Sequence, residues 1–244
     1  MRIIPVIDIL NGVTVHAVKG KRTKYKPLKS VLCNSTDAIA VASAFRSLGF
    51  GDLYVADLDA ITGKGENLAT MRQVVEDMGL KLMVDAGVCG QEQAKELLQC
   101  GVTRVIVGTE TLPSLSHLSL LLQSLGTDKV VVSLDLKDGK VLSKSLAIAS
   151  MGVVELARRL EEMGVLEVIV LDLARVGSGE GVDAALLEKL VHELKIKVDV
   201  GGGVRGIDDL LTLKRLGVQA VLLATALHQG KITIEDLRNS GLLD

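Results

Sequence analysis

Two aspartates end apolar runs in the two halves of the chain and could act together in proton transfer. Asp8 ends the run 4–8 and is followed by an Asn-Gly pair, and Asp135 ends the run 131–135, 127 residues further on, and is followed by an Asp-Gly pair. An ionised carboxylate at the end of an apolar strand is costly unless it is solvated or hydrogen-bonded. Each acid alone could simply cap the turn after it, but the pair predicts a general acid and a general base acting on one substrate.

A glycine loop also occurs twice, at a spacing of 116 residues. The second copy, Gly201-Gly202-Gly203, precedes a helical segment, so its backbone N–H groups could hold a phosphate without a cationic side chain. A tight turn is the alternative, although three successive glycines exceed what a turn requires. The turn after the last apolar run could supply further N–H groups and a hydroxyl. The predicted phosphate-binding residues of this half are Gly202, Gly203, Ala224 and Thr225.

The first copy of the glycine loop is less suited to a phosphate. Asp85 stands where the second copy has Gly201, and its carboxylate would repel an anion. Other positions of the first copy keep their counterparts and predict a second, weaker phosphate site, formed by Gly87, Gly108 and Thr109.

Three further residues are candidates for substrate binding. Asp57 and Asp172 end the second and sixth apolar runs, and a glycine-rich loop follows each of them. Lys19 begins the basic stretch 19–29, and no Asp or Glu occurs between Asp8 and Asp37. The stretch could be only a solvated loop, or it could close over a phosphorylated ligand and exclude water. One acid-free loop is not an extended basic face, so no nucleic-acid partner is expected.

The composition fits a cytoplasmic globular protein. A net charge of −2 over 244 residues gives no general attraction to nucleic acid. No apolar run is long enough to span a membrane, and the N-terminal residues lead directly into a predicted strand, so we expect neither a membrane segment nor a signal peptide. The three cysteines and four histidines lack the spacing of disulfide or metal sites, and we expect no metal and no other cofactor.

Apolar runs and helical periods alternate along the whole chain. Short runs rich in β-branched residues predict eight buried strands, at 3–8, 53–58, 81–85, 104–108, 130–135, 167–172, 197–201 and 219–224. Apolar residues at three- and four-residue spacing predict eight helices, at 37–48, 68–78, 91–100, 115–125, 153–163, 184–194, 208–216 and 234–240. Eight strand–helix units predict a single TIM barrel, (βα)8, rather than an open flavodoxin-like sheet. We expect one domain over 1–244, built from half-barrel repeats of about 1–125 and 126–244.

The motifs taken together resemble the histidine-biosynthesis barrel family over nearly the whole chain. The resemblance rests on Pro5-Val6-Ile7-Asp8 with Asn11-Gly12, Val55-Ala56-Asp57-Leu58-Asp59 with Gly65-Glu66-Asn67, Leu134-Asp135 with Asp138-Gly139, and Gly201-Gly202-Gly203-Val204. It implies a cofactor-free barrel for a substrate with two phosphates, in which Asp8 and Asp135 are catalytic and Asp8 is the leading base. The isomerases of the family are the closer match, and they imply an Amadori rearrangement of an aminoaldose to an aminoketose.

The chain departs from the isomerase pattern on the predicted active face. The resemblance implies a threonine and a second acid after the sixth strand, where this chain has Leu171 and Val176. It implies an arginine at Cys89, glycines at Asp85 and Ala86, and a tryptophan in the fifth loop, and this chain contains no Trp. Because a valine cannot transfer a proton, these changes predict a diverged, archaeal-type paralog with its own phosphorylated substrate, as an alternative to the isomerase itself.

Two classes of function remain open from the sequence. The first is a cofactor-independent enzyme acting on a phosphorylated sugar, an isomerase or else a lyase or cyclase of the same family. The second is a non-catalytic barrel that binds a phosphorylated metabolite or serves as a partner subunit. A homo-oligomer is compatible with either class.

Overall fold

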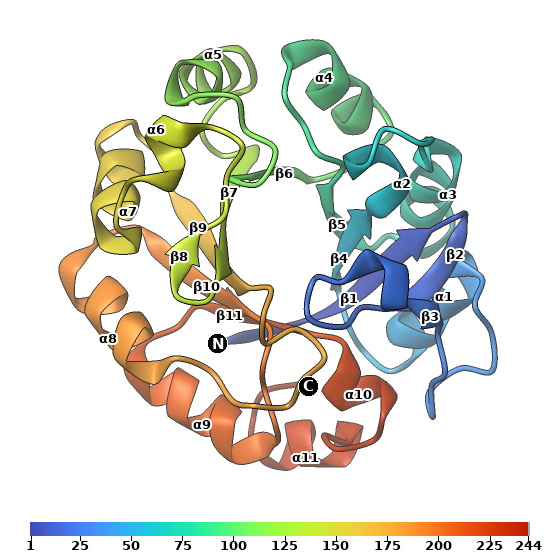
Figure 1. The fold of residues 1–244 in the computed structure, drawn as a ribbon. Coiled ribbons are helices and arrows are strands. Elements are labelled where there is room, and N and C mark those ends of the chain that lie inside the picture. Colours follow the sequence, from blue (N-terminus) through green and yellow to red (C-terminus); the bar gives the residue numbers. More distant parts are fainter. Residues whose placement is uncertain (244) are drawn as a thin grey trace.

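The computed structural model describes residues 1–243, and their parallel strands close into a barrel surrounded by helices (Figure 1). The strands, in spatial order, are β1 (Arg2–Leu10), β4 (Asp52–Asp57), β5 (Lys81–Asp85), β6 (Arg104–Gly108), β7 (Val130–Lys137), β9 (Glu167–Asp172), β10 (Lys197–Gly201) and β11 (Ala220–Leu223). Arg2 pairs with Ala220, so β11 closes the sheet against β1. The predicted TIM barrel is therefore confirmed.

Helices form the outer layer of the barrel. They are α1 (Ala38–Ser47), α3 (Leu68–Met78), α4 (Gln91–Gln99), α5 (Leu115–Leu125), α7 (Val153–Glu162), α8 (Ala184–Glu193), α9 (Ile207–Leu216) and α11 (Ile234–Asn239). Each buries the apolar side chains of its helical period against the strands; in α7 these are Val153, Leu156, Ala157 and Leu160. No helix within residues 1–243 is both long and apolar enough to cross a membrane.

Several short elements were not predicted, because they contain too few residues to show a period. They are β2 (Val13–His16), β3 (Lys26–Pro27), β8 (Lys140–Val141), the 3-10 helix Arg22–Lys24, α2 (Leu58–Ile61), α6 (Leu146–Ala149) and α10 (Thr225–His228). β2 is antiparallel to β1 and pairs Val15 with Asp8. β1 thus continues two residues beyond Asp8, and β7 continues two residues beyond Asp135. Both acids lie just before the ends of their strands, not at them.

Apolar side chains fill the barrel on both faces of its strands. One cluster lies inside the barrel and includes Ile4, Tyr54, Met83, Ile106, Val131, Ile169 and Leu222. A larger cluster lies between the strands and the helices. Val, Ile and Leu predominate in both clusters, because branched side chains pack well on the two faces of a buried parallel strand.

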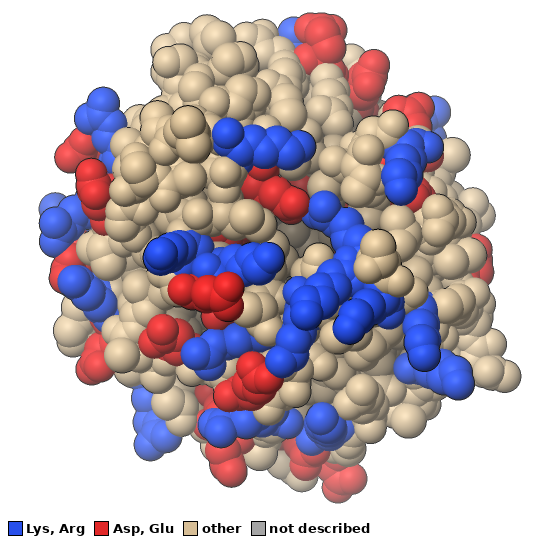
Figure 2. Space-filling model, viewed as in Figure 1, with Lys and Arg blue, Asp and Glu red and all other residues tan. Residues whose placement is uncertain are grey.

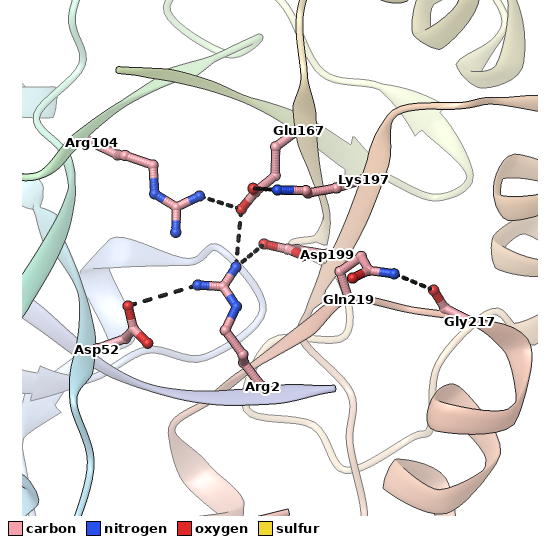
Figure 3. A network of polar contacts seen from close by, with 8 residues as sticks. All are labelled: Arg2, Asp52, Arg104, Glu167, Lys197, Asp199, Gly217 and Gln219. Carbon is pink, nitrogen blue, oxygen red and sulfur yellow. Dashed lines mark hydrogen bonds and ion pairs between the residues drawn. The ribbon is translucent and has the colours of Figure 1, made fainter. Parts of the chain in front are cut away.

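A network of charged residues closes the end of the barrel at which the strands begin (Figure 3). Glu167 contacts the guanidinium groups of Arg104 at 2.6 Å and Arg2 at 3.3 Å. Asp199 is fully buried beside them. Burial, followed by repulsion from Glu167 and a hydrogen bond to it, raises the pKa of Asp199 to about 8, so this carboxyl group keeps its proton at neutral pH.

The retained proton of Asp199 should make the stability of the protein depend on pH. The folded state binds a proton that the unfolded state has released, so this contribution is complete below pH 3.8 and is lost as the pH rises to about 8. Asp199→Asn keeps a hydrogen-bond donor without a titrating group. We expect the parent to lose stability relative to Asp199→Asn as the pH rises. The difference in free energy of unfolding, variant minus parent, should increase by about 1 kcal/mol or more from about pH 5 to about pH 8, measured by urea denaturation. A constant difference between the two proteins would contradict the assignment.

Candidate active site

A cavity of about 350 Å³ lies at the end of the barrel at which the strands finish. Both predicted catalytic acids, Asp8 and Asp135, line it. The other predicted site residues that line it are Lys19, Gly108, Gly202, Gly203, Ala224 and Thr225. Asp57, Gly87, Thr109 and Asp172 lie outside its lining. The structure therefore brings the two acids and the second-half glycine loop to one cavity.

A third carboxyl group, that of Asp85, joins the predicted pair inside the cavity. The three acids come from β1, β5 and β7, whose ends converge because the sheet is closed. A Cβ atom on Gly108 would stand 2.8 Å from Asp135 Oδ2 and 3.6 Å from Asp85 Oδ2. Gly108 is therefore the residue that lets Asp135 and Asp85 approach each other.

Hydrogen bonds fix Asp135 but not Asp8. Ser133 Oγ donates to Asp135 Oδ1 at 2.7 Å, and the backbone N–H of Glu110 donates to Oδ2 at 2.9 Å. The Asp135 N–H donates in turn to Thr109 Oγ1 at 2.9 Å, which is the role of Thr109 in the structure. Within residues 1–243 the Asp8 carboxylate has no hydrogen-bond or ion-pair partner, so both of its oxygens are available to a ligand.

The three carboxyl groups titrate near neutrality. Burial, with repulsion from Asp85 next, raises the pKa of Asp8 to about 7 and that of Asp135 to about 7. Burial raises the pKa of Asp85 to about 6, and the Gly87 N–H partly offsets this rise. Because neighbouring acids share their protons, the cluster holds ionised and protonated carboxyl groups together at neutral pH. A base and an acid are thus present in one cavity.

The second-half loops present unused backbone donors to the cavity. No residue within 1–243 accepts a hydrogen bond from the N–H groups of Gly203, Thr225 or Ala226. Gly203 has φ +88°, and a Cβ atom there would stand 2.3 Å from the Gly181 carbonyl oxygen, so only glycine fits. The Lys231 side chain also lines this part of the cavity. Convergent N–H groups beside an ammonium group can hold an anion.

The equivalent donors of the first half are all engaged. The Gly87 N–H donates to Asp85 Oδ1 at 3.0 Å, and the Thr109 N–H donates to the Ser133 carbonyl at 2.9 Å. The N–H of Glu110, the counterpart of Ala226, donates to Asp135. Gly87 and Thr109, predicted to bind a phosphate, therefore serve the acid cluster in this structure.

Asp57 and Asp172, the two predicted binding residues on strands two and six, hold their own loops. Asp57 Oδ2 accepts from the Asn67 N–H at 2.8 Å, and Asp57 Oδ1 caps α2 through the Ala60 N–H at 3.1 Å. Asp172 Oδ2 contacts Arg175 Nε at 2.9 Å. Both carboxylates act on the loops after β4 and β9 and do not reach into the cavity.

Two loops meet above the cavity and join its opposite sides. The Lys19 N–H donates to the Val176 carbonyl at 2.8 Å, and the Lys19 ammonium group pairs with Glu180. Arg22 pairs with Glu110 at 2.7 Å. Figure 2 shows Lys and Arg side chains gathered over the loop after β1. Lys19 and Arg22 at the mouth of the cavity are thus paired with acids, whereas the carboxyl groups of Asp8, Asp85 and Asp135 on its floor form no ion pair within residues 1–243.

His228, which also lines the cavity, is not a candidate for proton transfer. Burial lowers its pKa to about 4, so the ring is neutral at physiological pH. Its Nδ1 atom lies 2.9 Å from Ser30 Oγ, and its ring packs against Phe45 with centroids 5.4 Å apart. The ring supports the cavity wall.

Sequence reasoning missed the cavity roles of Asp85, Glu110 and Lys231. Asp85 was recognised only as a residue unsuited to phosphate, although its place at the end of an apolar run was the same signal that identified Asp8. Glu110 and Lys231 carried no comparable signal, because the loops that bring them to the cavity have no period in the sequence.

Comparison with known proteins agrees with this architecture. The family model described as "Histidine biosynthesis protein" matches residues 2–233. The chain belongs to the histidine biosynthesis protein family. It is 36% identical to an uncharacterized protein of Methanocaldococcus jannaschii, and the match covers 98% of each chain.

Two further members of the histidine biosynthesis protein family carry a named activity. Both are called 1-(5-phosphoribosyl)-5-((5-phosphoribosylamino)methylideneamino) imidazole-4-carboxamide isomerase. The relative from Methanosarcina mazei is 32% identical over 99% of this chain and 98% of its own. The relative from Alkaliphilus metalliredigens is 31% identical over 98% of each chain.

In this member of the histidine biosynthesis protein family, Leu171 lines the cavity beside Gly201, and Val176 lines it beside Gly202. Their side chains are apolar and supply no proton-transferring group after β9. The titrating groups of the cavity floor accordingly come from the first five strands of the barrel, on Asp8, Asp85 and Asp135.

If the unused N–H groups of the second half bind a phosphate, a negative charge introduced at Thr225 should weaken phosphate binding. Thr225→Asp places a carboxylate at the first position of α10, where it would occupy the donors and repel an anion. We expect inorganic phosphate to bind about tenfold more weakly or worse to this variant in isothermal titration calorimetry.

The matched control is Thr233→Asp, which introduces the same charge at the exposed N-cap of α11. We expect it to bind phosphate as the parent does. Equal loss of binding in the two variants would show that net charge, and not this loop, determines phosphate affinity.

Proposed function

We propose that this protein is a cofactor-independent isomerase that converts a phosphorylated aminoaldose to an aminoketose. The observation that supports it most is the acid cluster with pKa values near 7, which faces a set of unused backbone donors across one cavity. The cluster can move protons, and the donors can fix a phosphorylated substrate. The relatives named as isomerases support the same class of reaction.

The reaction requires an acid and a base in turn. A protonated carboxyl group gives its proton to the ring oxygen of the sugar, and the ring opens to an imine between the nitrogen and C1. A carboxylate then removes the proton from C2 of the protonated imine, which gives an enolamine. That proton returns to C1, and the C2 hydroxyl group gives its proton to the carboxylate left by the ring-opening acid, which yields the aminoketose and restores both groups. No proton or electron is gained or lost overall, so the side chains of the cavity suffice.

The hydrogen bonds of the two acids suggest their roles. Asp8 has no donor on either oxygen and is the group best placed to take the C2 proton and return it to C1. Asp135 is held by Ser133 and by the Glu110 N–H, which keep its carboxyl group in one orientation. We assign Asp135 the protonation of the ring oxygen, because a fixed acid protonates one atom selectively.

Replacement of either acid tests the assignment. Ribosylamine 5-phosphate, formed in solution from ribose 5-phosphate and ammonia, presents the required aminoaldose. In deuterated buffer we expect Asp8→Asn and Asp135→Asn to lower the rate of C2 proton exchange about 100-fold or more, followed by proton NMR. Asp183→Asn, at the exposed N-cap of α8, is the control and should keep the parent rate.

Retained exchange in both acid variants would show that the pair is not catalytic. Phosphate binding by a parent protein that catalyses no exchange would instead support the non-catalytic barrel that binds a phosphorylated metabolite.

The dependence of turnover on pH should follow the acid cluster. One carboxyl group must be ionised and another protonated, and both pKa values lie at about 7. We expect kcat/KM to pass through a maximum near this pH and to fall on both sides, because acid protonates the base and alkali removes the proton from the acid. A profile that is flat from about pH 5 to about pH 9 would exclude these groups.

A further inference from the structure

The two ends of the cavity differ in what their backbone can bind. At the second-half end, the N–H groups of Gly203, Thr225 and Ala226 have no acceptor within residues 1–243. At the first-half end, the corresponding N–H groups donate to Asp85, to the Ser133 carbonyl and to Asp135. A phosphate at the first-half end would find no free donor of this set. It would have to displace bonds that hold the acid cluster.

The charges at the first-half end also oppose an anion. Asp85 and Asp135 approach each other across Gly108, and Glu110 lies two residues further along the chain. Arg22 is the ion-pair partner of Glu110, so its charge is already matched. A phosphate bound here would face the carboxyl groups of Asp85 and Asp135 in a cavity where water screens charge poorly. A cation would be attracted by the same groups.

We propose that the substrate carries a single phosphate, held by the second-half loops, and a protonated amine at its other end, held by the carboxylate of Asp85. The proposal rests on the proposed function and defines its substrate class. It separates this protein from its relatives named as isomerases, because the name of their substrate contains two phosphoribosyl groups.

The orientation of Asp85 fits this role. Its Oδ1 atom accepts the Gly87 N–H, and its Oδ2 atom is the one near Gly108, on the side of Asp135 Oδ2. Tyr54 is buried in the barrel near Asp85, and burial, followed by the charge of Asp85, raises the pKa of the Tyr54 hydroxyl. Asp85 is thus fixed through Oδ1, and Oδ2 remains as an acceptor for an ammonium group.

Burial without a counterion supplies a physical reason for the preference. Burial raises the pKa values of Asp8, Asp85 and Asp135, and none of the three carboxyl groups forms an ion pair with a cationic side chain of residues 1–243. A bound ammonium group would lower these pKa values and release protons. A second phosphate would raise them and take protons up.

Three hexose phosphates that share one phosphate position provide the test. Glucosamine 6-phosphate has an amine in place of the C2 hydroxyl of glucose 6-phosphate, and glucose 1,6-bisphosphate has a second phosphate on C1. By isothermal titration calorimetry at neutral pH, we expect the amine to bind the parent protein about tenfold more tightly than either of the others. Repetition in buffers of different ionisation enthalpy should show that the amine releases more protons than glucose 6-phosphate does.

Two variants assign the preference to Asp85. Asp85→Gly restores the residue of the second-half loop and frees the Gly87 N–H, so we expect the bisphosphate to become the tightest ligand. Asp85→Asn keeps the size of the side chain and should abolish the advantage of the amine without creating a phosphate site. It also keeps the test valid if Asp85→Gly fails to fold, which thermal denaturation would show.

The possible results contradict either the substrate class alone or both proposals together. If the parent binds all the ligands equally, or the bisphosphate most tightly, the inference is overturned and the isomerase proposal stands. If Asp85→Asn keeps the preference for the amine, the assignment to Asp85 is wrong. If none of the hexose phosphates binds the parent, or if Thr225→Asp binds them as the parent does, the phosphate site itself is wrong and both proposals fail.

Discussion

The burial of three carboxyl groups at one end of a closed sheet is the constraint on which the active face depends. Parallel strands that close into a barrel bring their ends to one small region, so Asp8, Asp85 and Asp135 meet although they are far apart in the chain. Loss of hydration favours the protonated forms and raises their pKa values. Hydrogen bonds offset part of this cost for Asp85 and Asp135, and Asp8 receives none. The cost that remains makes the groups reactive near neutral pH.

The backbone N–H groups on two sides of the cavity differ in whether they have an acceptor within residues 1–243. A glycine at position 201 leaves the N–H of Gly203 without an acceptor, whereas Asp85, at the matching place, takes the N–H of Gly87. The first-half loops thereby exchange an anion site for a fixed carboxylate. An N–H group that already donates to a carboxylate, as that of Gly87 does, is no longer free for a phosphate.

The opposite end of the barrel uses charge for a different purpose. Around Glu167, the guanidinium groups of Arg2 and Arg104 pair with the carboxylate between the beginnings of the strands, and the protonated Asp199 is buried beside them. An apolar layer that contains Ile4, Met83 and Ile106 separates this network from the acid cluster. The network is compact and internally paired, whereas the acids at the other end lack cationic partners. This difference is consistent with a stabilising end and a reactive end, as in other barrels.

The sequence by itself determined the barrel, its eight strands and principal helices, and the place of Asp8 and Asp135 near the ends of strands one and five. Those features follow from the hydrophobic periodicity of single segments, which local sequence records. Only the tertiary structure decided that Asp85 joins the pair, that Gly108 permits the approach, and that the first-half N–H groups are engaged while the second-half ones are free. It also decided that Asp57 and Asp172 hold their loops. These outcomes depend on distances between atoms from different strands, and closure of the sheet sets those distances.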